Sequence, residues 1–346
     1  MPHPPPTSVG VIANPSSGRD MRRLLAWAST FPIAEKANVV LRLLSTMGRL
    51  GIDEAWMIPD PAGLARGVRD AANLARAQRG LPMPQVRLLD MPVRDAAEDT
   101  LAATTLMVAH GVRLIAVLGG DGTHRAVAAR CGSVPLATLS TGTNNAFPEL
   151  REATLVGMAS ALVATGRVSG AEALRTNKRL RISGAQVAEI ALVDACVSRQ
   201  LSIGARAVWQ GSDICDLFTT FAESNAIGLS SIAGLAHPVS RSDPFGVHVQ
   251  MGPGRTLRAP ILPGALEAVS IAAIRRLLPG RAVRLPAMRG TVALDGEREI
   301  EFDADHDLHL ALDLDGPRTV AVEQVLALAA RQGLLFDAPG PMAWTG

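Results

Sequence analysis

The sequence contains no tyrosine and only two lysines, Lys36 and Lys178, although arginine is abundant. The absence of tyrosine excludes mechanisms that need a phenolic acid or base. Glu35 and Asn177 precede the two lysines, so neither lysine completes the GxxxxGK(S/T) loop of P-loop proteins. No GxGxxG fingerprint opens the first strand and helix either. Any phosphate site in this chain must therefore be of another type.

Cysteine is also scarce. The three cysteines, Cys131, Cys196 and Cys215, are far apart and odd in number, and no CxxC spacing suggests a zinc site or a redox pair. This pattern fits a protein of the reducing cytoplasm.

Long apolar runs and basic blocks are missing as well. Residues 1–6 lack the basic and apolar regions of a signal peptide, and no later run approaches the ~20 apolar residues that cross a bilayer. The formal net charge of +2 comes from interspersed charges, which argues against nucleic acid as the main partner. We therefore expect a cytoplasmic protein with no membrane span, for which small anions remain candidate ligands.

The chain of 346 residues is long enough for two domains with separate cores. In its first part, apolar runs that predict buried strands alternate with segments of helical spacing. The expected strands are residues 9–13, 54–58, 86–89, 114–118 and 134–139, and the expected helices are residues 35–50, 62–79, 95–110, 125–130 and 149–164. This alternation predicts an α/β domain over residues 1–166, with a mostly parallel, Rossmann-like sheet covered by helices.

The pattern changes after Gly166. Short strand-type runs separated by turn residues predict an antiparallel, β-rich second domain over residues 167–319. These runs include residues 187–193, 246–251, 283–285, 291–294 and 308–314. Residues 320–335 return to helical spacing, and we expect the segment 320–346 to pack back onto the first domain.

The strongest local motif is GGDGT, which follows the buried strand 114–118. Its residues are Gly119, Gly120, Asp121, Gly122 and Thr123. The glycines let the backbone approach a ligand, and the helix expected from residue 125 would direct its N-terminal N–H groups at an anion. Among glycines Asp121 has no crowding neighbours, so it could face the ligand and accept a hydroxyl proton or hold Mg²⁺. An ordinary turn uses the same residue types, but the density of glycines favours a phosphate site.

Two further polar loops follow predicted strands. One contains Asn14, Ser16, Ser17 and Gly18, and the other contains Thr141, Gly142, Thr143, Asn144 and Asn145. Each alone is as compatible with a hydrogen-bonded turn as with a ligand site. The carboxyl ends of parallel strands meet at one edge of a sheet, so we expect the two loops to converge on the GGDGT segment.

These residues resemble the NAD kinase and diacylglycerol kinase superfamily, whose signature is GGDGT. Within it the chain looks most like the ATP-NAD kinase-like acetoin catabolism protein X family. The resemblance runs through nearly the whole chain, from the 14–18 loop through the 142–147 run and residues 191–194 to Asp295-Gly296-Glu297. It implies a NAD kinase-like two-domain fold with ATP and the acceptor meeting in the cleft.

By the same resemblance, Asp121 is the base for the attacking hydroxyl, which in NAD kinases is the 2′-hydroxyl of the adenosine ribose of NAD. ATP is then the donor, Mg²⁺ the metal and NAD the expected acceptor. The resemblance also implies assembly into a homodimer or larger. One departure concerns the acceptor, because Val193-Asp194 stands where NAD kinases have an Asn followed by an acidic residue. Asp194 is still expected to contact the nucleotide.

Other residues remain open between two roles. His124, which replaces an apolar residue of NAD kinases, could bind phosphate or cap its helix. Asp295 and Glu297 resemble the DGE of lipid kinases, where they support nucleotide and metal, but Asp-Gly is also a common hairpin turn. The acidic and histidine cluster at residues 303–309 is better explained by a solvated turn than by a metal site.

The sequence therefore favours an ATP-dependent kinase of the NAD kinase type, with NAD or a related nucleotide as acceptor. A lipid kinase acting on diacylglycerol or a sphingoid base is the alternative enzyme, favoured by Asp295-Gly296-Glu297 and the 142–147 run. A nucleotide-binding regulator that has lost turnover is the third hypothesis, motivated by Val193.

Overall fold

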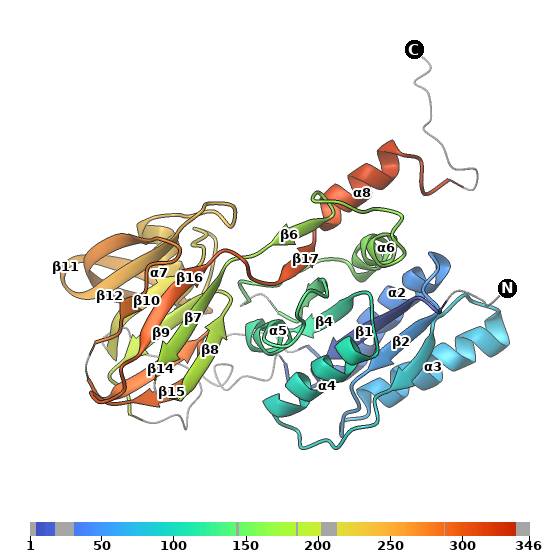
Figure 1. Cartoon of the computed structure of the whole chain (residues 1–346), viewed down its shortest axis with the longest axis horizontal. Helices are drawn as coiled ribbons and strands as arrows, with labels where there is room; N and C mark the ends of the chain where they lie inside the picture. Colours follow the sequence, from blue (N-terminus) through green and yellow to red (C-terminus); the bar gives the residue numbers. More distant parts are fainter. Residues whose placement is uncertain are drawn as a thin grey trace, which may run out of the picture.

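The structure is a computed structural model that describes residues 5–17, 31–142, 145–184, 186–201, 213–286 and 288–336. Figure 1 shows two parts side by side, an α/β part containing the N-terminus and a part made mainly of strands. Strands β6 (Leu174–Thr176) and β17 (Arg318–Val320) lie next to each other where the chain passes between the parts. The two parts are thus joined by a pair of antiparallel segments.

The α/β part is built on a seven-stranded sheet with the order β3-β2-β1-β4-β5-β17-β6. Its other strands are β1 (Ser8–Ala13), β2 (Glu54–Met57), β3 (Gln85–Leu88), β4 (Ile115–Gly119) and β5 (Leu136–Ser140). All neighbouring strands pair in parallel except β17 and β6. The predicted mostly parallel sheet is therefore confirmed, and β1 and β4 lie adjacent at its centre.

Helices cover both faces of this sheet. Helices α2 (Ile33–Arg49), α3 (Leu64–Arg79), α6 (Ala153–Ala164) and α8 (Val322–Arg331) enclose one apolar core, in which α8 packs on α6. Helices α4 (Ala97–Ala109) and α5 (Asp121–Ala128) enclose the core on the opposite face. The domain boundaries at residues 166 and 319 stay a prediction, and residues 337–346 lie outside the described part of the chain.

The second part contains two antiparallel sheets with a shared apolar core. The first has the order β12-β11-β10-β9-β14-β15, formed by Ala265–Leu277, Gly246–Leu262, Ile214–Thr219, Asp194–Ser198, Gly290–Leu294 and Glu297–Phe302. The second has the order β13-β16-β7-β8, formed by Val283–Arg284, His309–Asp313, Arg179–Gly184 and Val187–Ala191. Helix α7 (Ser230–Ala236) packs on the outer face of the six-stranded sheet. The prediction of an antiparallel β-rich region is confirmed.

Candidate active site

The GGDGT motif lies at the carboxyl end of β4, in the middle of the parallel sheet. The helix expected from residue 125 begins at Asp121 instead, with Gly120 as its extended N-cap residue. Asp121, Gly122 and Thr123 thus form the first helical turn rather than a loop. The expectation of a loop was wrong because the glycines are needed here for close packing rather than for a turn: a Cβ at Gly119 would lie 2.7 Å from Cβ of Thr123.

The carboxylate of Asp121 is held by the backbone of the loop after β5. The N–H of Ala146 donates to its two oxygens at 3.2 and 3.0 Å, and the N–H of Phe147 donates to Oδ1 at 2.8 Å. The expectation of an uncrowded Asp121 turned wholly to a ligand is therefore corrected, since two peptide N–H groups already fix its carboxylate. Such fixation orients the group for chemistry.

The electrostatic surroundings make Asp121 a weak acid. Burial raises the pKa of Asp121 to about 7, and the carboxylate of Asp295 adds to the rise, whereas the two bound N–H groups oppose it. A carboxyl group with this pKa can accept a proton near neutral pH and release it again. Desolvation is the dominant cause, as for other carboxyl groups tuned for acid–base work.

The loop after β1 meets the first turn of α5. Nδ2 of Asn14 donates to Oγ1 of Thr123 at 2.9 Å. Oδ1 of Asn14 accepts the N–H groups of Ser16 at 2.8 Å and Ser17 at 3.2 Å. The structure thus brings Asn14 and the GGDGT turn together at the sheet edge, while Gly18 lies outside the described residues.

Lys36 organises this loop and was not singled out from the sequence. It is fully buried in α2, and its Nζ donates to the carbonyls of Asn14 at 3.1 Å, Pro15 at 2.7 Å and Ser17 at 2.6 Å. A lysine that binds three carbonyls of one loop fixes the path of that loop.

The loop after β5 also lies beside the motif. Nδ2 of Asn145 donates to Oγ of Ser140 at 2.7 Å, and that hydroxyl donates to the carbonyl of Gly142 at 2.6 Å. A Cβ at Gly120 would lie 3.0 Å from Oδ1 of Asn145, so the amide packs directly on the glycine. Thr141 is buried, and Thr143 and Asn144 lie outside the described residues.

His124, for which the sequence left phosphate binding and helix capping open, is fully buried. It lies on the inner face of α5, and its Nδ1 is 2.8 Å from the carbonyl oxygen of Gly120. Burial lowers the pKa of His124 to about 4, so the ring is neutral at pH 7. A neutral, enclosed ring supports the packing of α5 rather than phosphate binding.

Asp295 and Gly296 form the two-residue hairpin turn between β14 and β15, with φ of 51° and 83°. The carboxylate of Asp295 accepts N–H groups from Leu192, Val193 and Asp194 at 2.8 to 3.2 Å. Burial raises the pKa of Asp295, which the guanidinium of Arg125 opposes from 3.7 Å. This carboxylate therefore holds the backbone between β8 and β9 in place by hydrogen bonds.

Glu297, two residues after Asp295, lies directly against the GGDGT motif. Its Oε2 would lie 3.3 Å from a Cβ added at Gly122, so the carboxylate packs against the first turn of α5. Asp194 is buried at the start of β9. Of the second-domain residues predicted for the site, Glu297 thus packs on the GGDGT turn, and Asp295 is near enough to raise the pKa of Asp121.

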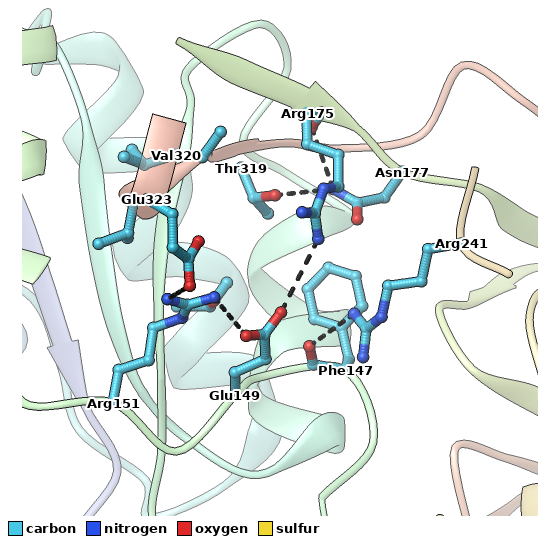
Figure 2. A pocket seen from close by; sticks show the side chains of 12 residues that line it. Phe147, Glu149, Arg151, Arg175, Asn177, Arg241, Thr319, Val320 and Glu323 are labelled. Carbon is cyan, nitrogen blue, oxygen red and sulfur yellow. Dashed lines mark hydrogen bonds and ion pairs between the residues drawn. The ribbon is translucent and has the colours of Figure 1, made fainter. Parts of the chain in front are cut away.

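Arg241 connects the second domain to this centre and was not found from the sequence. It precedes the long β11 strand and donates to the carbonyls of Ala146 and Phe147. Its Nε bonds Glu223 at 3.0 Å, and its guanidinium lies 4.1 Å from the ring centroid of Phe221. Figure 2 shows Arg241 reaching Phe147 across the junction of the two parts.

Charged residues secure the loop that follows Phe147. Arg151 pairs with both Glu149 and Glu323, the latter on α8, and Arg175 lies 3.8 Å from Glu149. These side chains line a small polar pocket (Figure 2). The segment 146–151 is thus held from the second domain on one side and from α8 on the other.

An open groove of about 780 Å³ borders the same segment. Its lining includes Glu149, Glu223, Asn225, Ser240, Arg241 and Asp243. Three carboxylates, an arginine, an amide and a hydroxyl thus give the groove a polar lining.

The described residues do not include a built metal centre. No group of three His, Cys, Asp or Glu side chains among them is arranged to hold a metal ion. The carboxylates of Asp121 and Asp295 are both committed to backbone N–H groups. In the 303–309 cluster, Nδ1 of His306 bonds Oδ1 of Asp303 at 2.6 Å in an exposed turn.

In the part of the chain that the structure describes, no helix is long and apolar enough to cross a membrane.

Comparison with known proteins agrees with this architecture. Residues 9–168 match the ATP-NAD kinase N-terminal domain, and residues 178–315 match the acetoin catabolism protein X C-terminal domain. The chain is 45% identical over 345 residues to acetoin catabolism protein X of Cupriavidus necator, covering 97% of this chain and 96% of that protein. Among solved structures, a candidate diacylglycerol kinase from Bacillus anthracis has a TM-score of 0.43 and 13% identity, covering 90% of this chain and 96% of the other. That structural likeness is too weak to carry an argument. On the sequence matches, the chain belongs to the acetoin catabolism protein X family and has the N-terminal domain of the ATP-NAD kinases.

Proposed function

We propose that this protein is a cytoplasmic ATP-dependent kinase of the NAD kinase type, which transfers the γ-phosphoryl group of ATP to a hydroxyl of NAD or a related nucleotide. The observation that carries the proposal is Asp121, a fixed carboxyl group with a pKa of about 7 at the N-terminus of α5. It combines a proton acceptor with a helix end that attracts phosphate.

In the proposed reaction, Asp121 takes the proton of the acceptor hydroxyl as the oxygen forms its bond to the γ-phosphorus. The bond from that phosphorus to the bridging oxygen breaks, and ADP leaves. The first-turn N–H groups of α5, at Asp121, Gly122 and Thr123, stabilise the phosphate charge. Phosphoryl transfer depends mainly on such positioning and charge neutralisation. Mg²⁺ would bind with the phosphates of ATP and would neutralise part of their charge during the transfer.

The polar lining of the open groove favours a polar acceptor over a lipid. Its carboxylates, amide and hydroxyl match the hydroxyls and amide of a nucleotide better than the alkyl chains of a lipid. Glu149 and Arg241 belong both to this groove and to the frame around Phe147. An acceptor in the groove would thus lie against the segment that binds Asp121.

The test incubates the purified protein with ATP, Mg²⁺ and NAD and follows NADP with an NADP-specific dehydrogenase. Asp121→Asn is expected to lower kcat/KM by about 10²-fold or more, since the base is lost. The matched control is Asp99→Asn in α4, whose carboxylate likewise accepts two backbone N–H groups, from Arg94 and Ala96. This control should keep its activity.

Two alternative outcomes are decisive. Phosphorylation of diacylglycerol or sphingoid vesicles without any NADP would establish the lipid kinase. Binding of ATP by calorimetry, with no phosphorylated product from either acceptor, would establish a nucleotide-binding regulator. Either result would overturn the proposed function.

A further inference from the structure

One peptide group separates Asp121 from Arg241. The N–H of Phe147 donates to Oδ1 of Asp121 at 2.8 Å, while the carbonyl of Ala146, in the same peptide group, accepts from Nη2 of Arg241. The N–H and C=O of a planar trans peptide point in opposite directions. Arg241 and Asp121 therefore bind the same peptide group from opposite sides.

Arg241 is itself held firmly. Glu223 and the ring of Phe221 fix its guanidinium. The loop that carries it is bound by Nζ of Lys178, which donates to the carbonyls of Ser240 at 3.0 Å, Asp243 at 2.9 Å and Phe245 at 2.8 Å. Arg241 thus has a fixed position in the second domain.

We propose that Arg241 is a positioning residue, which presses the Ala146–Phe147 peptide onto Asp121 and thereby keeps the base oriented and ionisable. This inference rests on the proposed function. A cation on the carbonyl polarises the peptide, and its N–H becomes a stronger donor to the carboxylate. The second domain would in this way control the base of the first.

Several charged groups face Asp121 and set the direction of the effect. The β14–β15 hairpin contributes Asp295, and the loop before β11 contributes Arg241. Nearby, Arg125 pairs with Asp295, Glu297 packs against Gly122, and the buried His124 of α5 is neutral. Burial and the carboxylate of Asp295 raise the pKa of Asp121, whereas Arg241 lowers it. Removing Arg241 should therefore move this pKa further upward.

The test compares Arg241→Gln and Arg241→Lys with Arg276→Gln as the matched control. Arg276 also lies over an aromatic ring, 4.7 Å from the centroid of Phe245, and it is on β12, where it pairs with Val247 of β11. For each protein the pH profile of kcat/KM is measured with ATP, Mg²⁺ and NAD. In Arg241→Gln, the acid limb of this profile, where kcat/KM falls as the base is protonated, should move to higher pH by about one unit. Activity should recover at high pH. Arg241→Lys should show a smaller shift, and Arg276→Gln none.

A second variant addresses folding. Glu223→Gln leaves the guanidinium in place and removes the carboxylate that anchors it, so the acid limb should shift in the same direction by a smaller amount. The positioning role is refuted if kcat/KM of Arg241→Gln is lower than that of the wild type by the same factor at every pH. It is also refuted if the pH profile of Arg241→Lys is no closer to the wild type than that of Arg241→Gln.

A readout without turnover separates this inference from the proposed function. The carboxyl ¹³C signal of Asp121, assigned by its loss in Asp121→Asn, is titrated in the wild type and in Arg241→Gln. An upward shift of the midpoint supports the positioning role even if no acceptor is phosphorylated. An unchanged midpoint in a folded variant rejects that role and leaves the kinase proposal standing.

Discussion

Lys36 and Lys178, the only two lysines of the chain, make the same arrangement in two loops that carry residues of the candidate active site. Each donates to three backbone carbonyls of a single loop, Lys36 to the loop after β1 and Lys178 to the loop before β11. The first loop places Asn14 on Thr123, and the second carries Arg241. A lysine has three donors and a compact charge, so it can bind three carbonyls at once. Neither lysine is therefore free to act as a phosphate-binding lysine.

Lys36→Met should destabilise the protein strongly. Methionine fills similar space but removes three part-buried hydrogen bonds to carbonyls. Each such bond contributes about 1 kcal/mol, so the expected loss is about 3 kcal/mol. Urea unfolding followed by circular dichroism measures this loss. Arg42→Met is the control, because Arg42 lies on the exposed side of the same helix in ion pairs with Glu35 and Glu152, and it should cost under about 1 kcal/mol. Equal losses in the two variants would refute the role of Lys36.

Asp121 should make the stability of the wild type depend on pH. Its folded pKa of about 7 exceeds the ordinary aspartate value of 3.8, so the folded state binds the proton more tightly than the unfolded chain. The stabilising contribution is present below about pH 4 and is lost as pH rises through about 7.

The free energy of unfolding of Asp121→Asn, relative to the wild type, should therefore increase between pH 4 and pH 7.5. The increase is expected to be on the order of 4 kcal/mol. Urea titrations at several pH values measure this difference, and other titrating groups such as His124 cancel in the comparison. A difference that does not change with pH would place the pKa of Asp121 near its ordinary value.

The fold could be predicted from the sequence because apolar residues recur with the periods of strands and helices. The buried strand 114–118 and the alternation around it predict the parallel sheet directly. The carboxyl-end rule also brings the loop at Asn14 to Thr123. The start of α5 was missed because the glycines at residues 119, 120 and 122 are usually read as a turn. Here they allow Thr123, Asn145 and Glu297 to pack closely.

Two site residues left a signal that sequence reasoning did not use. Lys36 has the spacing of the apolar face of α2, four residues before Val40 and seven before Leu43, which predicts its burial. His124 precedes Val127 on the inner face of α5 in the same way. Arg241 left no such signal, because it lies in a polar loop and the backbone carbonyls that it binds in the first domain are more than 90 residues away.

The close packing of the GGDGT turn gives a test that does not depend on any assay of activity. A Cβ at Gly119 would lie 2.7 Å from Cβ and 2.8 Å from Oγ1 of Thr123, so Gly119→Ala must displace the first turn of α5. Displacing a packed side chain costs about 1 to 3 kcal/mol, and it would also disturb the hydrogen bond from Asn14 to Thr123.

Gly67→Ala in α3 is the matched control, because no atom lies within 4 Å of the added Cβ. Within a helix this change should raise stability by about 0.5 to 1 kcal/mol. Thermal unfolding of the two variants should therefore shift in opposite directions. If Gly119→Ala were as stable as the wild type, the first turn of α5 would not be as tightly packed as its geometry requires, and the glycines of GGDGT would have to be explained by ligand approach alone.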